Sequence, residues 1–387
     1  MKNHLTSESV CQGHPDKLCD YIADSILDAC LSVDSYSRVA CEVMATRGKI
    51  IVAGEITSSR RINVRETVRS ALRESGYDPK EFTVSIFLHT QSPDIADGVD
   101  TALEVRGSKS TAQELGAGDQ GTVYGYATDE TPSHIPLPLE LSHRICRGLD
   151  SCRKEGTILG IRSDGKAQVS VEYEDGKPSR VAAIIVSVQH ERDKDLAVLK
   201  DEIIRGVLYP AFGDFPFDAH TRILINPSGR FVEGGPGADT GLTGRKIMVD
   251  TYGGLALHGG GAFSGKDPTK VDRSGAYMAR MIAKNIVAAK LARRCEVAIS
   301  YAIGKADPVA VNVHTFSTGS VSDERLAHAV SVVFSLRPRA IIEQLGLRNP
   351  IYSLTSCYGH FGNALFAWEQ VTGQYAEAIK GELDHDH

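Results

Sequence analysis

The sequence lacks any apolar run long enough to span a membrane. Its longest strongly apolar run, residues 181–188, has about the length of a buried strand and falls well short of the ~20 residues that a spanning helix needs. The first residues, MKNHLTSES, contain neither an apolar core nor a cleavage-like site, so we expect no secretory signal. The eight cysteines form no C-x-x-C pair and no paired zinc spacing. We therefore expect a cytoplasmic protein with reduced thiols and no membrane partner.

The sequence also lacks an excess of positive charge. It carries 43 Lys and Arg against 49 Asp and Glu, a formal net charge of -6. This balance argues against binding to nucleic acid through broad phosphate attraction, and we expect no nucleic-acid partner. Any anion that the chain binds must meet a local cluster of basic side chains. The length of 387 residues favours two or three domains.

Three segments share one pattern, in which two alternating strands are joined by a turn. They begin at residues 38, 168 and 296, so their spacing is close to constant at about 130 residues. The second contains Asp175-Gly176, a strong hairpin signal. A stretch of helical periodicity follows each segment, at 64–75, 195–207 and 324–336. The pattern predicts an α+β fold of three similar domains, each a mixed sheet with helices on one face, at residues 3–99, 115–231 and 233–371.

The segment GHPDK predicts the start of a helix, because Pro15 suits the first helical position and apolar residues then recur every four positions. His14 and Asp16 lie where the free N–H groups of a helix N-terminus favour an anion. A carboxylate beside a phosphate needs a metal ion between them, so Asp16 is a candidate Mg²⁺ ligand. Three further aspartates share another face of this helix, and we expect them to be solvated: Asp20, Asp24 and Asp28.

Glu42 and Glu55 belong to the first predicted hairpin. With Arg47-Gly48 as a two-residue turn, Glu42 faces Ala53, and Glu55 lies two residues further along the same face, which separates the carboxylates by roughly 7–8 Å. The other residues of that face are apolar. Charges seldom lie on an apolar face without partners, so we expect each glutamate to meet a cation. The alternative is a solvent-exposed face with scattered charge.

Two glycine-rich segments match nucleotide-binding patterns but lack their context. Residues 116–121 fit G-x-G-x-x-G, yet no strand precedes them and no apolar helix follows, so dinucleotide binding is not favoured. What remains is a glycine loop that presents Asp119. Residues 260–266 fit the Walker A pattern, but Asp267 replaces the final Ser or Thr and no strand leads into the loop. A P-loop nucleoside triphosphatase is therefore not favoured either.

The region 226–274 is the richest in candidate binding residues. It is dense in glycine and contains five clustered basic residues, Arg245, Lys246, Lys266, Lys270 and Arg273. Backbone N–H groups freed by glycine can surround a polyphosphate, with these side chains as counter-charges. Asp239 and Asp272 lie among the cations, as a partner for a substrate ammonium group and a metal ligand would. The alternative, a surface loop with balanced charge, explains neither three successive glycines nor this many cations in an acidic chain.

Four segments in this order and spacing closely resemble the methionine adenosyltransferases: GHPDK, GAGDQG, GGPGADTGLTGRK and GGGAFSGKDPTKVDRS. The similarity extends over nearly the whole chain. It implies three α+β domains related by pseudo-threefold symmetry. It also implies an enzyme in which the sulfur of methionine attacks C5′ of ATP to form S-adenosylmethionine, and the triphosphate is then hydrolysed to pyrophosphate and phosphate. The family works as a homodimer with active sites shared between subunits, usually paired into a homotetramer.

The resemblance further implies roles for individual residues. Two Mg²⁺ ions per site would be held by Asp16 and Asp272, and one K⁺ per subunit by Glu42. The implied ATP contacts are His14, Asp164, Lys166, Arg230, Phe231, Asp239, Arg245, Lys246, Ala262 and Lys266. The implied methionine contacts are Glu55, Asp97, Asp239 and Lys270. The residues implied to act on the reaction itself are His14, Asp119, Lys166, Arg245, Lys246 and Lys266.

These residue types suit the implied reaction. A thioether sulfur is nucleophilic and carries no proton, so the reaction needs no general base. Fixed positive charge and metal ions ease the departure of a triphosphate. Two positions depart from the family pattern: Asp97 stands where Gln is common, and Ala367 where Pro is usual. The competing hypotheses are a kinase or ATPase that releases ADP, and a non-catalytic subunit that binds adenine nucleotides.

Overall fold

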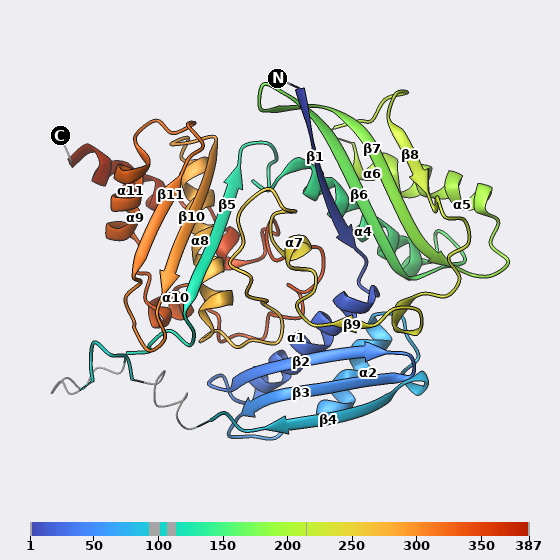
Figure 1. The fold of residues 1–387 in the computed structure, drawn as a ribbon, viewed down its shortest axis with the longest axis horizontal. Helices are drawn as coiled ribbons and strands as arrows, with labels where there is room; N and C mark the ends of the chain where they lie inside the picture. The colour runs from blue at the N-terminus through green and yellow to red at the C-terminus, as the bar shows by residue number, and fades with distance from the viewer. Residues whose placement is uncertain (1, 93–100, 107–113, 214, 386–387) are drawn as a thin grey trace.

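The computed structural model describes residues 2–92, 101–106, 114–213 and 215–385. Within them, a long helix, a β-hairpin and a shorter helix follow one another three times (Figure 1). The long helices are α1 (Pro15–Val33), α4 (Leu137–Glu155) and α8 (Val271–Ala288). The hairpins are β2 (Arg38–Thr46) with β3 (Lys49–Thr57), β6 (Ile161–Glu174) with β7 (Lys177–His190), and β10 (Arg294–Tyr301) with β11 (Ala310–His314). The shorter helices are α2 (Val64–Glu74), α5 (Leu196–Ile203) and α9 (Asp323–Val333), so the predicted repeat is confirmed.

The three sheets exchange strands in a closed cycle. The strand before each long helix joins the sheet of the next unit: β1 (Lys2–Val10) pairs with β6, β5 (Gly121–Thr128) with β10, and β9 (Gly241–Leu242) with β2. Two further strands, β4 (Thr83–His89) and β8 (Arg222–Ile225), run parallel to β3 and β7. The resulting sheet orders are β4-β3-β2-β9, β1-β6-β7-β8 and β11-β10-β5. The pseudo-threefold repeat therefore applies to the connections as well as to the elements.

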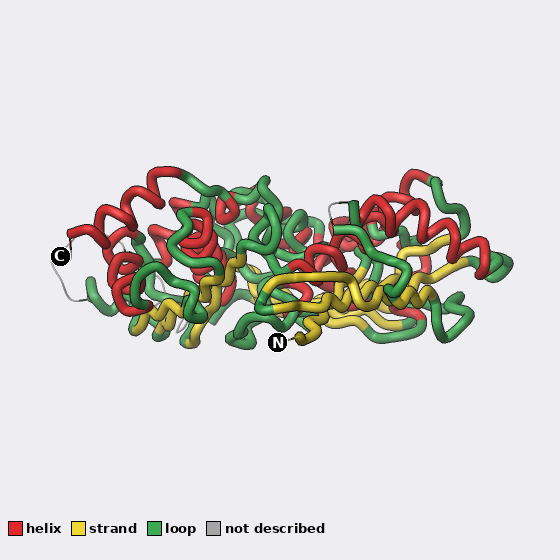
Figure 2. The backbone as a smooth tube through the Cα atoms, turned by 90° about the horizontal axis from the view of Figure 1, so that it is seen from above, coloured by secondary structure: helices red, strands yellow, loops and turns green. Residues whose placement is uncertain are grey.

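Helices and strands occupy different sides of a flattened molecule. Figure 2 shows most strands along one side and most helices along the other. Each long helix packs on its own hairpin and on the strand that its sheet receives: α1 on β2 and β9, α4 on β6 and β1, and α8 on β10 and β5. Alternate residues of the strands are buried beneath these helices, as Val39, Cys41, Val43 and Ala45 are in β2. Burial of such apolar faces holds each sheet to its helices.

Turn residues explain the hairpins locally. Asp175 and Gly176 both have positive φ, at 50° and 75°, as a tight two-residue hairpin turn requires. In the first hairpin Gly48 takes a φ of 69°. The register there places Glu42 opposite Ala53, as predicted.

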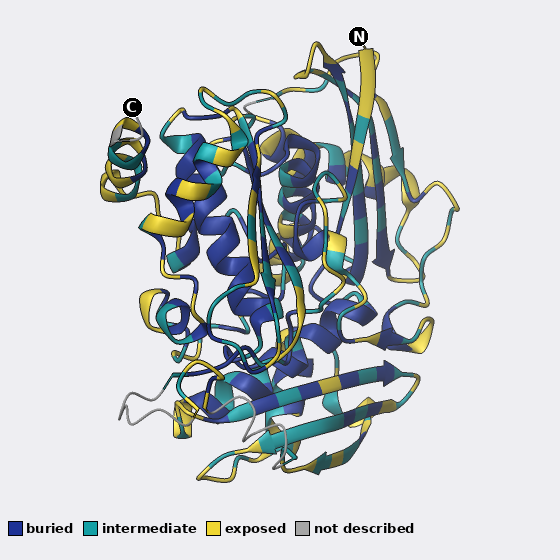
Figure 3. Cartoon of the chain, turned by 60° about the vertical axis from the view of Figure 1, so that its left-hand side comes forward, coloured by how far each residue is buried: buried dark blue, intermediate teal, exposed yellow. Residues whose placement is uncertain are grey.

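The interior consists of two apolar cores. One is shared by the first and third units, and the other belongs to the second unit. Buried residues gather on the helices and on the inward strands (Figure 3). Buried charges on α8 are paired: Arg280 donates to both carboxylate oxygens of Glu369 at 2.8 and 2.9 Å, and Lys284 donates at 2.7 Å. Removing one partner of such a pair costs about 3–5 kcal/mol.

The remaining elements connect and cap these units. They are the α-helices α6 (Tyr209–Ala211), α7 (Ile247–Asp250), α10 (Pro338–Gln344) and α11 (Gly373–His385), the short 3-10 helices η1 (Pro79–Glu81), η3 (Gly235–Gly237) and η4 (Ala367–Glu369), and the π-helix η2 (Ile204–Leu208). All eight cysteines are free and seven are buried, which agrees with the expected thiols. Within the described ranges, every helix is too short or too polar to cross a membrane.

Candidate active site

The N-terminus of α1 positions His14. This residue is the N-cap of the helix, and its Nδ1 accepts a hydrogen bond from the backbone N–H of Asp16 at 3.2 Å. Burial lowers the pKa of His14 to about 3, and the positive charge of Lys246 acts in the same direction. The imidazole is therefore neutral at pH 7. With Nδ1 assigned as the acceptor, Nε2 carries the proton and can donate to an anion.

Asp16 is buried among donors from the glycine-rich region. Its Oδ2 accepts a hydrogen bond from Lys246 Nζ at 2.5 Å, and its Oδ1 accepts one from the backbone N–H of Leu242 at 3.0 Å. Arg245 Nε lies 3.6 Å from Oδ1. Burial alone would raise the pKa of Asp16, but the hydrogen bonds from Lys246 and Leu242 outweigh it and lower the pKa. The fold thus brings together three predicted residues, Asp16, Arg245 and Lys246.

The other aspartates of α1 are not solvated, so that prediction is wrong. Asp20 and Asp24 are fully buried, and Asp28 is half-buried. Asp20 accepts a hydrogen bond from the backbone N–H of Gly244 at 2.8 Å, and Asp24 accepts one from that of Gly265 at 2.9 Å. Asp28 accepts two from residues 352–353, each at 2.8 Å. The burial of these carboxylates is offset by loop N–H groups that bond all three and by the buried cations Lys17 and Arg273, which pair with Asp20 and Asp24.

Glycine lets the basic loops lie directly on their neighbours. A Cβ at Gly241 would come within 2.0 Å of the Pro15 carbonyl oxygen, and one at Gly265 within 2.0 Å of the Cys41 carbonyl oxygen. A Cβ at Gly244 would lie 2.5 Å from the methyl group of Ala262. This contact joins the loop that carries Arg245 and Lys246 to the loop that carries Lys266.

The start of α8 forms a second group of predicted residues. Lys266 donates a hydrogen bond to Asp272 at 2.6 Å, and a Cβ at Gly261 would come within 2.4 Å of the same carboxyl group. Lys270, the N-cap of α8, donates instead to the buried Asp267 at 2.5 Å. The other contacts of Asp267 include the backbone N–H of residue 39 in β2 at 2.7 Å. The first turn of α8 is thereby tied to the first sheet.

The loop that carries Asp119 lies against this same turn. A Cβ at Gly118 would come within 2.9 Å of the carbonyl oxygen of Thr269, the residue before Lys270. Asp119 is exposed, and its Oδ1 accepts a hydrogen bond from the backbone N–H of Gln120 at 2.7 Å. Strand β5 follows this loop rather than preceding it, which agrees with the rejection of a dinucleotide-binding motif.

Asp164 and Lys166 lie on β6. Asp164 Oδ2 accepts a hydrogen bond from the backbone N–H of Gly235 at 2.7 Å, yet burial raises the pKa of this carboxyl group to about 6. Lys166 donates to Glu8 of β1 at 2.5 Å, and its charge contributes to the lowered pKa of His14. These residues therefore belong to the His14 side of the site.

Three further predicted ATP residues lie on the segment that leads from β8 to β9. Arg230 and Asp239 are exposed, whereas Phe231 is half-buried. Phe231 is fixed through its backbone, whose N–H donates to His190 Nε2 at 3.0 Å and whose carbonyl accepts from the backbone N–H of His190 at 2.9 Å. The Phe231 ring is thus carried by a segment anchored to the end of β7.

One face of the first sheet carries Glu42 and Glu55. His89 Nε2 lies 3.4 Å from Glu55 Oε1 and forms an ion pair with it when protonated. Desolvation raises the pKa of Glu42, and the charge of Lys266 opposes this shift. The same sheet exposes two large apolar side chains, Phe87 at 65% and Leu242 at 40% of their surface. In the single chain this sheet face is open to solvent.

Among the described residues, no cluster of three or more His, Cys, Asp or Glu side chains could hold a metal ion by itself. Asp16 and Asp272 each offer one carboxylate, and each is bonded to a lysine. Mg²⁺ is usually bound through one or two carboxylates together with substrate phosphates. These donors therefore fit Mg²⁺ in the company of a bound polyphosphate.

The sequence alone does not reveal the positioning role of several residues that hold the site in place. Glu8 binds Lys166, and Asp267 binds Lys270. The buried Asp20 and Asp24 accept hydrogen bonds from loop N–H groups. The four-residue spacing of the aspartates was the available signal, but it is equally typical of a solvated face. Asp97 lies outside the described residues.

The chain is similar to known proteins over all three of its units. Family models for the N-terminal, central and C-terminal domains of S-adenosylmethionine synthetase match residues 2–93, 114–231 and 233–370. An S-adenosylmethionine synthase of Finegoldia magna is 51% identical over 394 residues, covering 99% of this chain and 100% of that protein. Its counterpart in Desulforudis audaxviator is 52% identical over 382 residues, covering 96% and 97%. One from Staphylococcus epidermidis is 50% identical, covering 96% of each. The chain therefore belongs to the S-adenosylmethionine synthetase family.

Proposed function

We propose that this chain joins ATP and methionine to form S-adenosylmethionine, the reaction for which its family is named. One observation carries the proposal: a carboxylate–lysine pair stands at the N-terminus of each of two long helices. These pairs are Asp16 with Lys246 at α1, and Asp272 with Lys266 at α8. A helix N-terminus, a lysine and glycine N–H groups together suit a polyphosphate, and the carboxylates suit its metal ions.

The reaction needs no base from the protein. The sulfur of methionine forms a bond with C5′ of ATP while the C5′–O bond breaks, and that electron pair leaves with the triphosphate. His14, neutral and donating from Nε2, is assigned to the oxygen that bridges C5′ and the triphosphate. Arg245, Lys246 and Lys266 oppose the negative charge that grows on the leaving group. The same cations would serve the hydrolysis of the triphosphate to pyrophosphate and phosphate.

We assign the rest of the ATP contacts to residues near these cations. The assigned residues are Asp164, Lys166, Arg230, Phe231, Asp239 and Ala262. The Asp164–Gly235 and Lys166–Glu8 contacts support the assignment, because they fix a carboxylate and an ammonium group beside His14.

Two Mg²⁺ ions are assigned to Asp16 and Asp272, and one K⁺ to Glu42. When bound, the Mg²⁺ ions would neutralise phosphate charge. Lys246 and Lys266, which bond these two carboxylates in the chain alone, would then be free to meet phosphate oxygens.

Methionine is assigned to Glu55, Asp97, Asp239 and Lys270, with Asp119 close to the reacting sulfur. In the chain alone the buried Asp267 holds the ammonium group of Lys270, the group that would meet the methionine carboxylate. The contact between Gly118 and Thr269 places the Asp119 loop beside this lysine.

We further propose a homodimer with shared active sites, paired into a homotetramer, in the cytoplasm. The exposed Phe87 and Leu242 on the sheet that carries Glu42 and Glu55 support burial of that sheet against a second copy. The domain boundaries proposed are residues 3–99, 115–231 and 233–371, with the sheets exchanging strands across them.

Incubation of the chain with ATP, methionine, Mg²⁺ and K⁺, followed by mass analysis of the products, tests the proposal. S-adenosylmethionine, pyrophosphate and phosphate should form only when methionine is present. ADP as the main product would instead identify a kinase or ATPase, and nucleotide binding without turnover would identify a non-catalytic subunit.

A further inference from the structure

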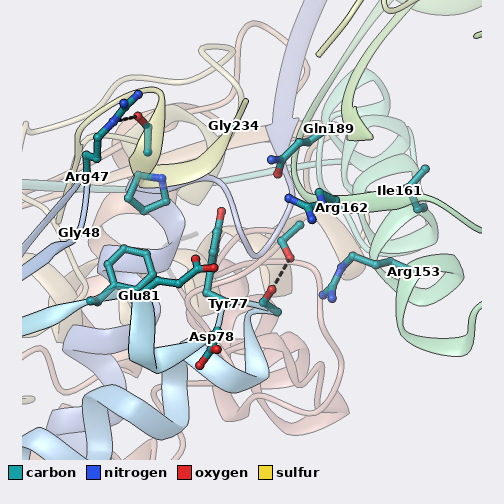
Figure 4. Close-up of a pocket in the computed structure, with 15 residues that line it drawn as sticks. Arg47, Gly48, Tyr77, Asp78, Glu81, Arg153, Ile161, Arg162, Gln189 and Gly234 are labelled. Carbon is teal, nitrogen blue, oxygen red and sulfur yellow. Dashed lines mark hydrogen bonds between the residues drawn. The ribbon is translucent and has the colours of Figure 1, made fainter. Parts of the chain in front are cut away.

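A cavity of about 520 Å³ lies between the first and second units. Its walls come from the β2–β3 turn, the segment between α2 and η1, the end of α4, the start of β6 and residues 234–237 (Figure 4). The residues assigned above to ATP, methionine and metal ions are not among those that line it. The cavity is therefore distinct from the proposed active site, and the inference does not depend on the reaction.

Two arginines form one side of this cavity. Figure 4 shows Arg153, from α4, and Arg162, from β6, on the side that faces Tyr77 and Glu81. In the described part of the chain, Nε and Nη2 of Arg153 are buried without a hydrogen-bond partner, although Asp150 lies 3.5 Å from Nη2. A buried donor without an acceptor costs about 1–3 kcal/mol, and more when it is charged.

Glycines fix the geometry around these arginines. Gly76 has a φ of 84°, and a Cβ there would come within 2.5 Å of Arg153 Nη1. Gly235 has a φ of 63°, and a Cβ there would come within 2.2 Å of the Tyr77 hydroxyl oxygen. Both positions combine a left-handed backbone with contact against a lining side chain, so the walls are closely packed rather than loose.

We propose that this cavity binds a small organic anion whose carboxylate or phosphate oxygens pair with Arg153 and Arg162. Guanidinium groups bind both kinds of oxygen through charge-assisted hydrogen bonds. Asp78 and Glu81 lie on other parts of the lining. Their charges disfavour a polyanion that fills the whole cavity and favour an anion that carries hydroxyl or ammonium groups at its other end.

The cavity adjoins the proposed ATP site through its lining residues. The Tyr77 hydroxyl donates a hydrogen bond to the carbonyl oxygen of Gly13, the residue before His14. Ser163 lines the cavity and precedes Asp164, whose carboxylate accepts from the backbone N–H of Gly235.

Isothermal titration calorimetry on the full chain tests the proposal, with inorganic phosphate and citrate as separate probes. The titrations use the Lys266→Ala variant of the full chain as the background, because this substitution weakens phosphate binding at the proposed active site. Arg162→Gln and Arg153→Gln should each weaken binding roughly tenfold or more, the loss expected of one charge-assisted hydrogen bond. Arg162 is exposed, so its variant should fold even if the Arg153 variant does not.

The matched control is Arg147→Gln. Arg147 is exposed on α4 and lines a neighbouring cavity of about 730 Å³, which Arg153 also lines. Binding that survives Arg147→Gln and falls in Arg162→Gln supports the proposal, and the stronger probe identifies a phosphate or a carboxylate ligand. Binding that falls in Arg147→Gln alone would move the anion to the neighbouring cavity and overturn the proposal. Absence of binding by both probes would also overturn it.

Discussion

The substitution Asp24→Asn tests whether α1 holds the candidate site together. The two oxygens of Asp24 accept hydrogen bonds from Arg273 Nη1 and Nη2 at 2.7 and 2.9 Å, and Oδ1 also accepts from the backbone N–H of Gly265 at 2.9 Å. Asparagine has nearly the same shape, but it removes the charge and turns an NH₂ group toward a guanidinium group. The change therefore breaks a buried ion pair without creating a cavity.

The size of the effect follows from these contacts. Removing one partner of a buried ion pair costs about 3–5 kcal/mol, and asparagine keeps one acceptor, so we expect a loss of about 2–4 kcal/mol in the free energy of unfolding. Gly265 precedes Lys266, and a shift of about 1 Å in a catalytic group lowers the rate on the order of 10²-fold. We therefore expect kcat to fall roughly 10–100-fold with a smaller change in the KM for methionine.

Urea unfolding followed by the fluorescence of Trp368 measures the stability change. Trp368 is the one tryptophan of the chain, and it stacks on Tyr277, whose hydroxyl oxygen accepts a hydrogen bond from Arg273. The control is Asp28→Asn, one turn further along α1, which should lose less stability and keep a normal kcat. An Asp24→Asn variant within about 0.5 kcal/mol of the parent, with unchanged kcat, would refute the reasoning.

Three further predictions concern charge and protonation. Lys266→Ala and Arg245→Ala should each lower kcat on the order of 10²–10³-fold, because both oppose charge on the leaving triphosphate; a rise in the methionine KM alone would contradict this. If Asp97 faces the methionine carboxylate, Asp97→Gln should lower the methionine KM and leave the ATP dependence nearly unchanged, because the substitution removes the repulsion between two like charges; unchanged KM and analogue preference would remove Asp97 from the site. Burial lowers the pKa of His143 to about 3, below its unfolded value of about 6.5, so the unfolded state takes up the proton first and stability falls as pH drops from about 6.5 toward 3. The His143→Gln variant should therefore lose less stability than the parent as the pH falls. Urea midpoints that drop equally for parent and variant between pH 7.5 and 5.5 would contradict this prediction.

Local patterns predicted the repeated units well. Alternating apolar residues and the Asp175-Gly176 turn act between neighbours in the chain, so the hairpins and the pairing of Glu42 with Ala53 could be read from the sequence. The exchange of strands between the three sheets could not be read from the sequence. Strand β9 has only two residues, which is too short to show a periodic pattern. Its partner in β2 lies about 200 positions earlier, so no local pattern in the sequence indicates the pairing.

The sequence nominated the residues of the candidate site, but it did not indicate which other residues hold them in place. Clustered cations among glycines pointed to Lys246 and Lys266, because opposed charge and freed N–H groups are visible in composition. The burial of Asp20 and Asp24 depends on loop N–H groups that come from elsewhere in the chain. A four-residue spacing of carboxylates has the same appearance whether water or a loop satisfies it.

The cyclic exchange of strands also constrains the order in which the chain can fold during its synthesis. Strand β2 leaves the ribosome early, but the backbone N–H of Val43 bonds to Thr243, 200 residues later. Until then the first sheet keeps an unpaired edge, a surface on which nascent chains aggregate. Strand β1 likewise waits for β6. Each unit closes the sheet of another, so a chain interrupted before residue 241 cannot complete its first sheet, although all the strands of its second sheet have been made by residue 225.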